Sequence, residues 1–308
     1  MMQRSGQVAL LSIWIATTAS AAAAPPGLCS RWATPEVQGQ LDTSLLPEAS
    51  GIDIATSGDR LYHNNDGTEP NFLVTGRGGG NPRRVTVEGF DAVDVEDLAV
   101  GPCGERTCLF LADVGDNGSR RQSVQIAIIE EQRDFGPTVR PRTIITAHYP
   151  DGPHNSEAIA LHPSGDLFLV TKAGSGAGRS GPAKVYRLTA AQLAAGGVQT
   201  FELRGDIPVP ELIGTGVTAR QVVTAMDIAP DGSRFLLLTY DYMLEFAVDL
   251  TAQLPGDWSK AALHRAAPIE ALIQAEAIAY DQDGRSVLYS SESVLGSRAP
   301  VMRQRCEE

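Results

Sequence analysis

The stretch Glu157-Ala-Ile-Ala-Leu-His-Pro-Ser-Gly165 sets the plan of this chain, because the same nine-residue pattern occurs five times. Each copy opens with an oxygen-bearing side chain, continues with apolar residues and closes with a glycine turn. The copies are Ser50–Gly58, Glu96–Gly104, Glu157–Gly165, Thr224–Gly232 and Glu276–Gly284. They begin 46 to 67 residues apart, which matches propeller repeats of about 40 to 50 residues with loop insertions added.

A short apolar run follows each glycine turn, and more strand-like segments come after it. In the second repeat these segments are Val124–Ile129 and Thr143–Thr146. The runs are too short for helices and indicate about four strands in every repeat. We therefore predict an all-β fold, a five-bladed β-propeller with four antiparallel strands per blade. A β-sandwich or a two-domain fold is the alternative, but five-fold repetition is hard to place in either.

The last repeat has only three strands, which end at Val301–Cys306, while an unpaired strand near Cys29–Thr34 precedes the first repeat. We expect this N-terminal strand to pair with the last blade and so close the ring. The segment Ala190–Gly197 reads as a short helical turn in an outer loop. Among the four cysteines, Cys103 and Cys108 enclose a hairpin-sized loop, which favours a local disulfide and leaves Cys29 to bond Cys306 across the seam.

The first 24 residues have the layout of a secretory signal peptide. Arg4 precedes an apolar run over Val8–Thr17, and small residues at Ala22–Ala24 form a cleavage site. A membrane anchor is the alternative, but the run is shorter than the roughly 20 residues that span a bilayer. We expect a secreted or periplasmic protein with one propeller domain over residues 25–308 and no membrane association after cleavage.

The composition excludes some classes of partner. The chain of 308 residues has 25 Lys and Arg against 37 Asp and Glu, for a net charge of -12, and 43% of its residues are hydrophobic. The apolar content excludes a disordered chain, and the acidic balance argues against nucleic acid, whose phosphates require a basic surface. We expect a monomer that binds a small molecule.

The opening residues of the five repeats should line one end of the central channel, because the first strand of each blade is the innermost. Three carboxylates about 7 Å apart repel by about 2 kcal/mol per pair at an effective dielectric of 20, so the cluster favours a cation. Calcium accepts six to eight oxygens in flexible geometry, whereas magnesium requires an octahedron and zinc prefers nitrogen or sulfur. We predict one axial Ca²⁺ with the ligands Ser50, Glu96, Glu157, Thr224 and Glu276.

The second strand of each blade returns to the same end of the channel and brings further polar residues there. We assign as candidate catalytic bases Asp66, Asp113, Asp116 and Glu292, and as candidate ligand-binding residues Asn65, Asn117, Arg120, Lys172, Tyr240 and Asp241. The loop Asp113–Arg121 combines oxygen ligands with two guanidinium groups and fits a phosphate or a second metal; a hydrogen-bonded Asx turn is its structural alternative. Lys172 either pairs with Glu157 or anchors an anionic substrate.

Two resemblances follow from these residues. Val95–Ala99, Ala112–Asn117 and Ser156–Ala160 resemble a group of uncharacterised secreted bacterial five-bladed propellers, over most of the mature chain. The order Ser50, Glu96, Glu157, Thr224, Glu276 resembles the calcium-activated nucleotidase (apyrase) family, in which a Ser, Glu, Glu, Ser, Glu ring holds an axial calcium. The match departs at Thr224, which keeps an oxygen. This second resemblance implies calcium and does not extend to that family's nucleotide-contacting segments.

The sequence leads to a first hypothesis of a calcium-dependent hydrolase that acts on a small anionic metabolite, phosphorylated or nucleotide-like, at the channel mouth. A non-catalytic propeller that binds a ligand or a protein, with calcium in a structural role, is the second hypothesis. A glycosidase with paired carboxylates is a third, but an aromatic content of 6% offers few stacking platforms for a sugar.

Overall fold

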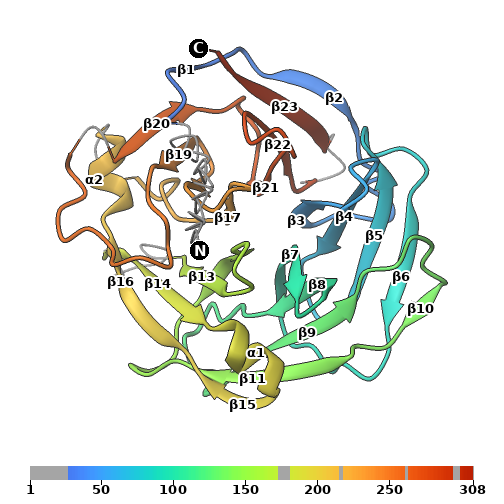
Figure 1. Cartoon of the computed structure of the whole chain (residues 1–308). Helices are drawn as coiled ribbons and strands as arrows, with labels where there is room; N and C mark the ends of the chain where they lie inside the picture. Colours follow the sequence, from blue (N-terminus) through green and yellow to red (C-terminus); the bar gives the residue numbers. More distant parts are fainter. Residues whose placement is uncertain (1–26, 173–180, 215–217, 261–262, 294–298, 308) are drawn as a thin grey trace, which may run out of the picture.

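Five small, mostly antiparallel sheets form a ring around a central axis in the computed structural model (Figure 1). The structure describes residues 27–172, 181–214, 218–260, 263–293 and 299–307. The predicted five-bladed β-propeller is confirmed. The predicted signal segment, residues 1–24, lies outside the described residues.

Each of the first two blades has four antiparallel strands from the axis outward and a fifth strand borrowed from the chain that follows. Blade 1 consists of β3 (Ala49–Ile54), β4 (Arg60–Asn65), β5 (Asn71–Gly76), β6 (Arg83–Val87) and the borrowed β10 (Thr138–Val139). Blade 2 consists of β7 (Val95–Cys103), β8 (Arg106–Asp113), β9 (Val124–Glu130), β11 (Thr143–His148) and the borrowed β15 (Gly197–Thr200). Both borrowed strands run parallel to their neighbours and cover edges that would otherwise be open.

The next two blades have four strands each. Blade 3 consists of β12 (Ser156–Leu161), β13 (Leu167–Thr171), β14 (Ala183–Leu188) and β16 (Glu202–Ile207). Blade 4 consists of β17 (Ala225–Ile228), β18 (Phe235–Leu238), β19 (Tyr242–Phe246) and β20 (His264–Pro268). The described residues form two short helices, α1 (Ala190–Ala195), which matches the predicted helical turn, and α2 (Val209–Ile213). Neither has the length or the apolar character to cross a membrane.

Blade 5 closes the ring as predicted. Its strands β21 (Ala275–Tyr280), β22 (Ser286–Ser291) and β23 (Pro300–Glu307) come from the last repeat, and the N-terminal strands β1 (Arg31–Trp32) and β2 (Glu36–Gln40) pair antiparallel with β23. Figure 1 shows β1, β2 and the C-terminus side by side. Both predicted disulfides are present, Cys29–Cys306 on this seam and Cys103–Cys108 across the β7–β8 hairpin.

The apolar residues form five separate cores, one between each pair of neighbouring blades. Strand β12 shows how alternation produces this arrangement. Its residues Ile159 and Leu161 pack into the core shared with blade 2, whereas Ala158 and Ala160 face the core shared with blade 4. Because successive side chains of a strand point to opposite faces, one blade contributes to both of its interfaces.

The glycine that closes each repeat turns the chain from the first strand into the second. All five of these glycines have a positive φ, between 61° and 88°: Gly58, Gly104, Gly165, Gly232 and Gly284. This left-handed conformation favours glycine over residues with a Cβ atom. The repeat therefore encodes the hairpin that joins the two innermost strands of every blade.

Aspartates connect the innermost strands of neighbouring blades, which do not pair in a sheet. Asp53 accepts a hydrogen bond from the Val100 amide of the next blade, and Asp97 accepts one from the Ile159 amide at 2.8 Å. Asp227 accepts a third from the amide of Tyr280 at 2.6 Å. Each aspartate also accepts the amide of the residue that follows it. These contacts tie blade 1 to 2, 2 to 3, and 4 to 5.

We predict that the two disulfides differ in their effect on stability. Cys29 and Cys306 are 277 residues apart, whereas Cys103 and Cys108 are five apart. In the chain-entropy model these loops correspond to about 6 and about 2 kcal/mol respectively. Urea unfolding of the two double alanine variants should show the larger loss for the seam bond. Equal losses would contradict this assignment.

Candidate metal centre at the channel mouth

The opening residues of the repeats share one local geometry. Ser50, Glu96, Glu157 and Glu276 each lie at a β-bulge, where the register between the first and second strand of the blade shifts by one residue. Thr224 directly precedes β17 and its amide donates to the Leu238 carbonyl. All five are buried, with at most 5% of their surface exposed. A bulge re-aims a side chain out of the regular alternation, here at the same end of every blade.

The residues that follow the second strands arrive at the same mouth through a repeated hydrogen bond. The amide of Asp66 donates to the carbonyl of Glu48, that of Lys172 to Asn155, and that of Glu292 to Gln274. Each acceptor lies two residues before an opening position of the repeat. The sequence-based expectation that one mouth collects the polar residues therefore agrees with the strand geometry.

Lys172 neutralises one side of this mouth. Its ammonium group forms an ion pair with Glu157 and lies 3.7 Å from Oε1 of Glu276. The Tyr240 hydroxyl donates to the same Glu276 oxygen at 3.0 Å, and the ammonium lies 5.5 Å from the centre of the tyrosine ring. Burial alone would lower the pKa of Lys172, but Glu157 and then Glu276 outweigh it and raise the pKa. Lys172 therefore compensates the carboxylates as the first of its two sequence-based readings expects.

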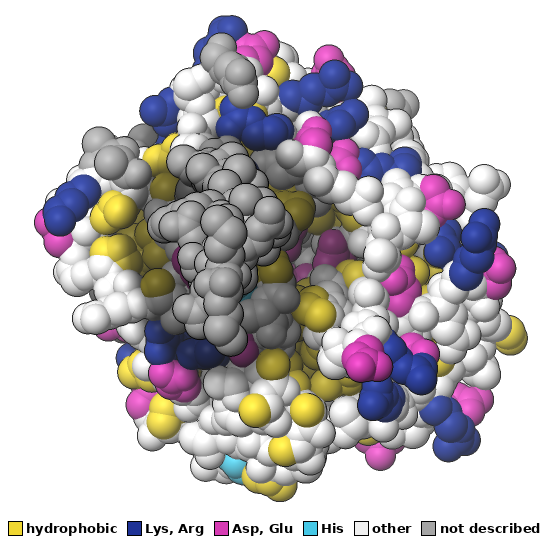
Figure 2. Space-filling view, in the orientation of Figure 1, with side chains coloured by type: hydrophobic (Ala, Val, Ile, Leu, Met, Phe, Trp, Pro, Cys, Tyr) yellow, Lys and Arg dark blue, Asp and Glu magenta, His cyan; other side chains and the backbone are white. Residues whose placement is uncertain are grey.

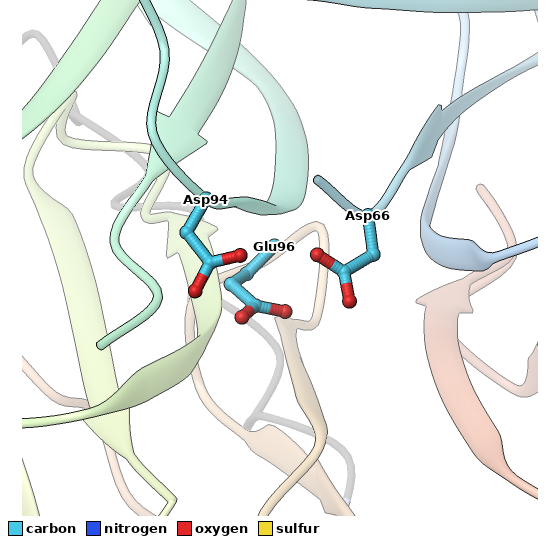
Figure 3. Close-up of side chains that lie close together, drawn as sticks. All are labelled: Asp66, Asp94 and Glu96. Carbon is cyan, nitrogen blue, oxygen red and sulfur yellow. The ribbon is translucent and has the colours of Figure 1, made fainter. Parts of the chain in front are cut away.

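The other side of the mouth holds a second acidic cluster. One carboxylate oxygen each from Asp66, Asp94 and Glu96 lies within 4.8 Å of the other two. Figure 3 shows the carboxyl groups of Asp66 and Asp94 pointing toward each other, with that of Glu96 between them. Asp66 follows β4, Asp94 precedes β7 and Glu96 lies within β7, so blades 1 and 2 build the cluster together.

Because these carboxyl groups are close together and shielded from water, their ionised forms are disfavoured in the absence of a cation. Burial, followed by the charges of Asp94 and Glu276, raises the pKa of Asp66 to about 7. Burial and then Glu157 hold the pKa of Glu96 well above its usual value, and burial raises that of Asp94. Across the mouth, burial raises the pKa of Glu157 to about 8; the charge of Lys172 opposes this rise and the charge of Glu276 adds to it.

The loop that carries Asp94 is held in place by Asp113. This fully buried aspartate accepts hydrogen bonds from the amides of Val93 and Asp94 at 3.0 and 2.6 Å. It also accepts a bidentate pair of hydrogen bonds from Arg121, Nη1 to Oδ1 at 2.9 Å and Nη2 to Oδ2 at 2.6 Å. Arg121 donates a further hydrogen bond to the Gly115 carbonyl. Asp113 thus has its oxygens occupied by the loop and positions the acidic cluster instead of facing a substrate.

The acidic cluster fits a calcium ion by three observations. Its donors are all carboxylate oxygens, the ligands that calcium prefers. The buried Oδ1 of Asp66 has no hydrogen-bond partner in the described part of the chain. A Cβ atom at position 115 would collide with Oε1 of Glu96 and Oδ2 of Asp94, so the backbone of Gly115 forms a close wall around the two oxygens. Of the five predicted ring ligands, only Glu96 belongs to this cluster.

The other predicted ring and loop residues have more local contacts. Thr224 donates its hydroxyl to the Ala275 carbonyl at 2.7 Å and so ties blade 4 to blade 5. Asp116 accepts the amides of Arg120 and Arg121, four and five residues further on, so the loop is held by hydrogen bonds of its own side chain but differs from the predicted Asx turn. The remaining candidates lie around the rim. Asn65 accepts a hydrogen bond from the Glu48 amide, and Asn117 accepts one from Nδ2 of Asn155 at 3.4 Å. Asp241 forms an ion pair with Arg220, and Arg120 is exposed.

Sequence reasoning did not identify Asp94 or Gly115. A usable signal existed for Asp94, since the position two residues before each opening residue is polar in four of the five repeats: Glu48, Asp94, Asn155 and Gln274. The role of Gly115 depends on how closely two loops approach each other, which no spacing in the sequence records.

No family model matches the chain, and no curated protein matches it. Two solved structures with a similar outline are a luciferin-regenerating enzyme and the Swd1 β-propeller domain of Myceliophteria thermophila. The enzyme has 12% identity and a TM-score of 0.48, over 88% of this chain and 95% of its own. The Swd1 domain has 9% identity and a TM-score of 0.38, over 79% of this chain and 62% of its own. These values are too low to assign an activity.

Calcium should stabilise the protein through the acidic cluster. At a concentration of about 100 times Kd, a ligand that binds only the folded state adds about 2.7 kcal/mol, so the melting temperature of EDTA-treated protein should rise on addition of CaCl₂. Gly115→Ala should abolish this rise, because its methyl group would displace two ligand oxygens. Gly118→Ala in the same loop is the control, since its Cβ would lie 3.4 Å from Arg120 at ordinary contact distance.

Calcium affinity should depend on pH around neutrality. Because the pKa of Asp66 is about 7 in the metal-free protein, calcium must displace a proton below that pH, and its affinity should fall by up to about tenfold per pH unit. The metal-free protein should lose stability as the pH rises from the usual aspartate value through about 7, since the folded form holds a proton that the unfolded chain releases. Calorimetry in two buffers measures the proton release, and a pH-independent affinity would contradict the assignment.

Proposed function

We propose that this chain is an exported, calcium-dependent hydrolase of a small anionic metabolite, phosphorylated or nucleotide-like, with its site at the acidic mouth of the propeller. The observation that carries the proposal is the convergence of Asp66, Asp94 and Glu96. These residues would hold the ion. When bound there, calcium supplies polarisation of a substrate oxygen and stabilisation of the charge that develops on it.

Glu292 is the proton donor in this proposal. Burial, followed by the hydrogen bond and charge of Glu276, raises the pKa of Glu292 to about 9, so its carboxyl group is protonated at neutral pH. Gln274 holds it in place by donating Nε2 to its Oε2 at 2.5 Å. A neutral carboxylic acid at a solvent-accessible mouth is suited to protonate a leaving group. Lys172 keeps Glu157 and Glu276 compensated beside it.

An anionic substrate is favoured by the loop next to the cluster. Arg120 is exposed there, and no described residue forms an ion pair with its guanidinium group. Arg121 and Lys172, in contrast, are engaged by Asp113 and Glu157. Arg120 and the proposed calcium would therefore offer the positive charge that a phosphate or carboxylate group requires.

Export is supported by the two disulfides, since such bonds persist in oxidising compartments and are rare in the cytosol. The calcium proposal agrees with this location, because extracellular calcium sites bind in the range of about 10⁻⁴ to 10⁻³ M.

Hydrolysis of nucleotides, phosphate esters and lactones, with and without EDTA, tests the proposal. We expect calcium-dependent turnover of at least one anionic substrate. Glu292→Gln should reduce kcat by about a hundredfold or more, the usual range for a general acid, and should leave the calcium-dependent rise in melting temperature intact. Asp59→Asn is the control, because Asp59 is exposed beside the Gly58 turn at the opposite end of blade 1, pairs with Arg60 and should not affect turnover.

The outcomes separate catalysis from binding. Calcium binding without hydrolysis of any substrate in the panel would overturn the enzyme proposal and favour the non-catalytic propeller. Full activity in Glu292→Gln would overturn the assignment of the proton donor. Failure to bind calcium would overturn the metal centre itself.

A further inference from the structure

The opposite mouth of the channel contains a cavity that the proposed hydrolase does not use. It has a volume of about 420 Å³, within the range of about 300 to 1,000 Å³ that is usual for small-molecule sites. Its lining comes from the ends of the innermost strands and the turns that follow them. Because these strands start at the acidic mouth described above, their ends meet at the other end of the axis. The cavity is therefore separate from the proposed calcium site.

Two carboxyl groups and an apolar wall give this cavity its character. Asp53 of blade 1 and Asp227 of blade 4 line it, and both side chains retain partial exposure. The apolar lining is supplied by Ile54, Val100, Leu161, Ile228 and the prolines Pro102, Pro163 and Pro230. Thr56, Thr107 and Gln282 add neutral polar groups to the lining, so Asp53 and Asp227 are the acidic groups of a cavity with a largely apolar wall.

The carboxylate oxygens of the two aspartates can each accept a further hydrogen bond. Each of their oxygens accepts one backbone amide: Asp53 binds those of Ile54 and Val100, and Asp227 binds those of Ile228 and Tyr280. A carboxylate oxygen has two lone pairs, so one further donor can approach each oxygen. Among the described residues, no lysine, arginine or histidine forms an ion pair with either aspartate.

No basic side chain of the described residues compensates this pair, so both carboxyl groups favour the protonated form when the cavity is empty. Burial raises the pKa of Asp53 to about 7, and burial followed by the charge of Asp53 raises that of Asp227. Carboxylates in such surroundings are stabilised by a positively charged partner. A metal ion is a poor candidate, because the described residues contain one group of three converging ligands and it lies at the other mouth.

We propose that this cavity binds a small aliphatic amine as its ammonium ion, with Asp53 and Asp227 as counter-ions and the apolar wall around its hydrocarbon chain. An ammonium group has three donors, and the oxygens of Asp53 and Asp227 each keep one lone pair free. The cavity volume of about 420 Å³ suits a free small molecule.

Binding of n-hexylammonium chloride, measured by calorimetry and by the shift in melting temperature, tests this proposal. We expect saturable binding, with hexan-1-ol and ammonium chloride much weaker, because each lacks one of the two features that the cavity recognises. Asp227→Asn should weaken binding by about tenfold or more, the usual effect of losing a charged hydrogen-bond partner. Asp94→Asn, at the other mouth, should leave amine binding unchanged while it weakens calcium binding.

A second variant guards against a folding defect in Asp227→Asn, since Asp227 also ties two blades together. Thr107 lines the cavity from the β7–β8 hairpin. Thr107→Lys would place a tethered ammonium at the rim and should abolish n-hexylammonium binding, whereas Thr107→Gln, similar in length and uncharged, should retain most of it. Equal binding of hexan-1-ol, or full amine binding in both Asp227→Asn and Thr107→Lys, would overturn the proposal.

Discussion

Negative charge buried along the axis is the constraint on which the rest of this propeller depends. The innermost strands converge without pairing in one sheet, and side-chain carboxylates supply the acceptors that join them. Asp53, Asp97 and Asp227 accept amides from the next blade, a use that places acidic groups where water is scarce. Each such carboxyl group is then stabilised by a hydrogen-bond donor, by protonation or by a cation. The two mouths of the channel differ in which of these they provide.

At the mouth where the innermost strands begin, a basic side chain of the protein compensates some of the carboxylates. Lys172 compensates Glu157 and Glu276, whereas no basic side chain among the described residues forms an ion pair with Asp66, Asp94 or Glu96. This asymmetry turns a ring with near five-fold repetition into a site with two unlike sides. The repeats form the scaffold. Residues that differ between the repeats, Lys172 in blade 3 and Asp94 in blade 2, make the two sides of the site chemically different.

Much of the fold could be predicted from the sequence, because the repeat encodes its own hairpins. The closing glycines take up left-handed turns, the opening residues lie at bulges, and the cysteines pair as their positions require. The site could be predicted only in part. The five opening residues were expected to act alike, but Thr224 bonds a neighbouring carbonyl and Glu157 bonds Lys172. Asp94 joins the cluster through a loop that Asp113 holds, a tertiary contact with no local signature.

The disulfide between Cys29 and Cys306 makes the described propeller a covalent circle. In a circle, a single cut in any connecting loop leaves one continuous molecule, because the rest of the circle still joins the two segments beside the cut. The seam itself is an antiparallel strand pairing inside blade 5, similar to the pairings inside the other blades. A circular permutant with its new termini in a loop of another blade would keep the same blade packing. The order in which the blades follow one another along the chain is therefore independent of the architecture.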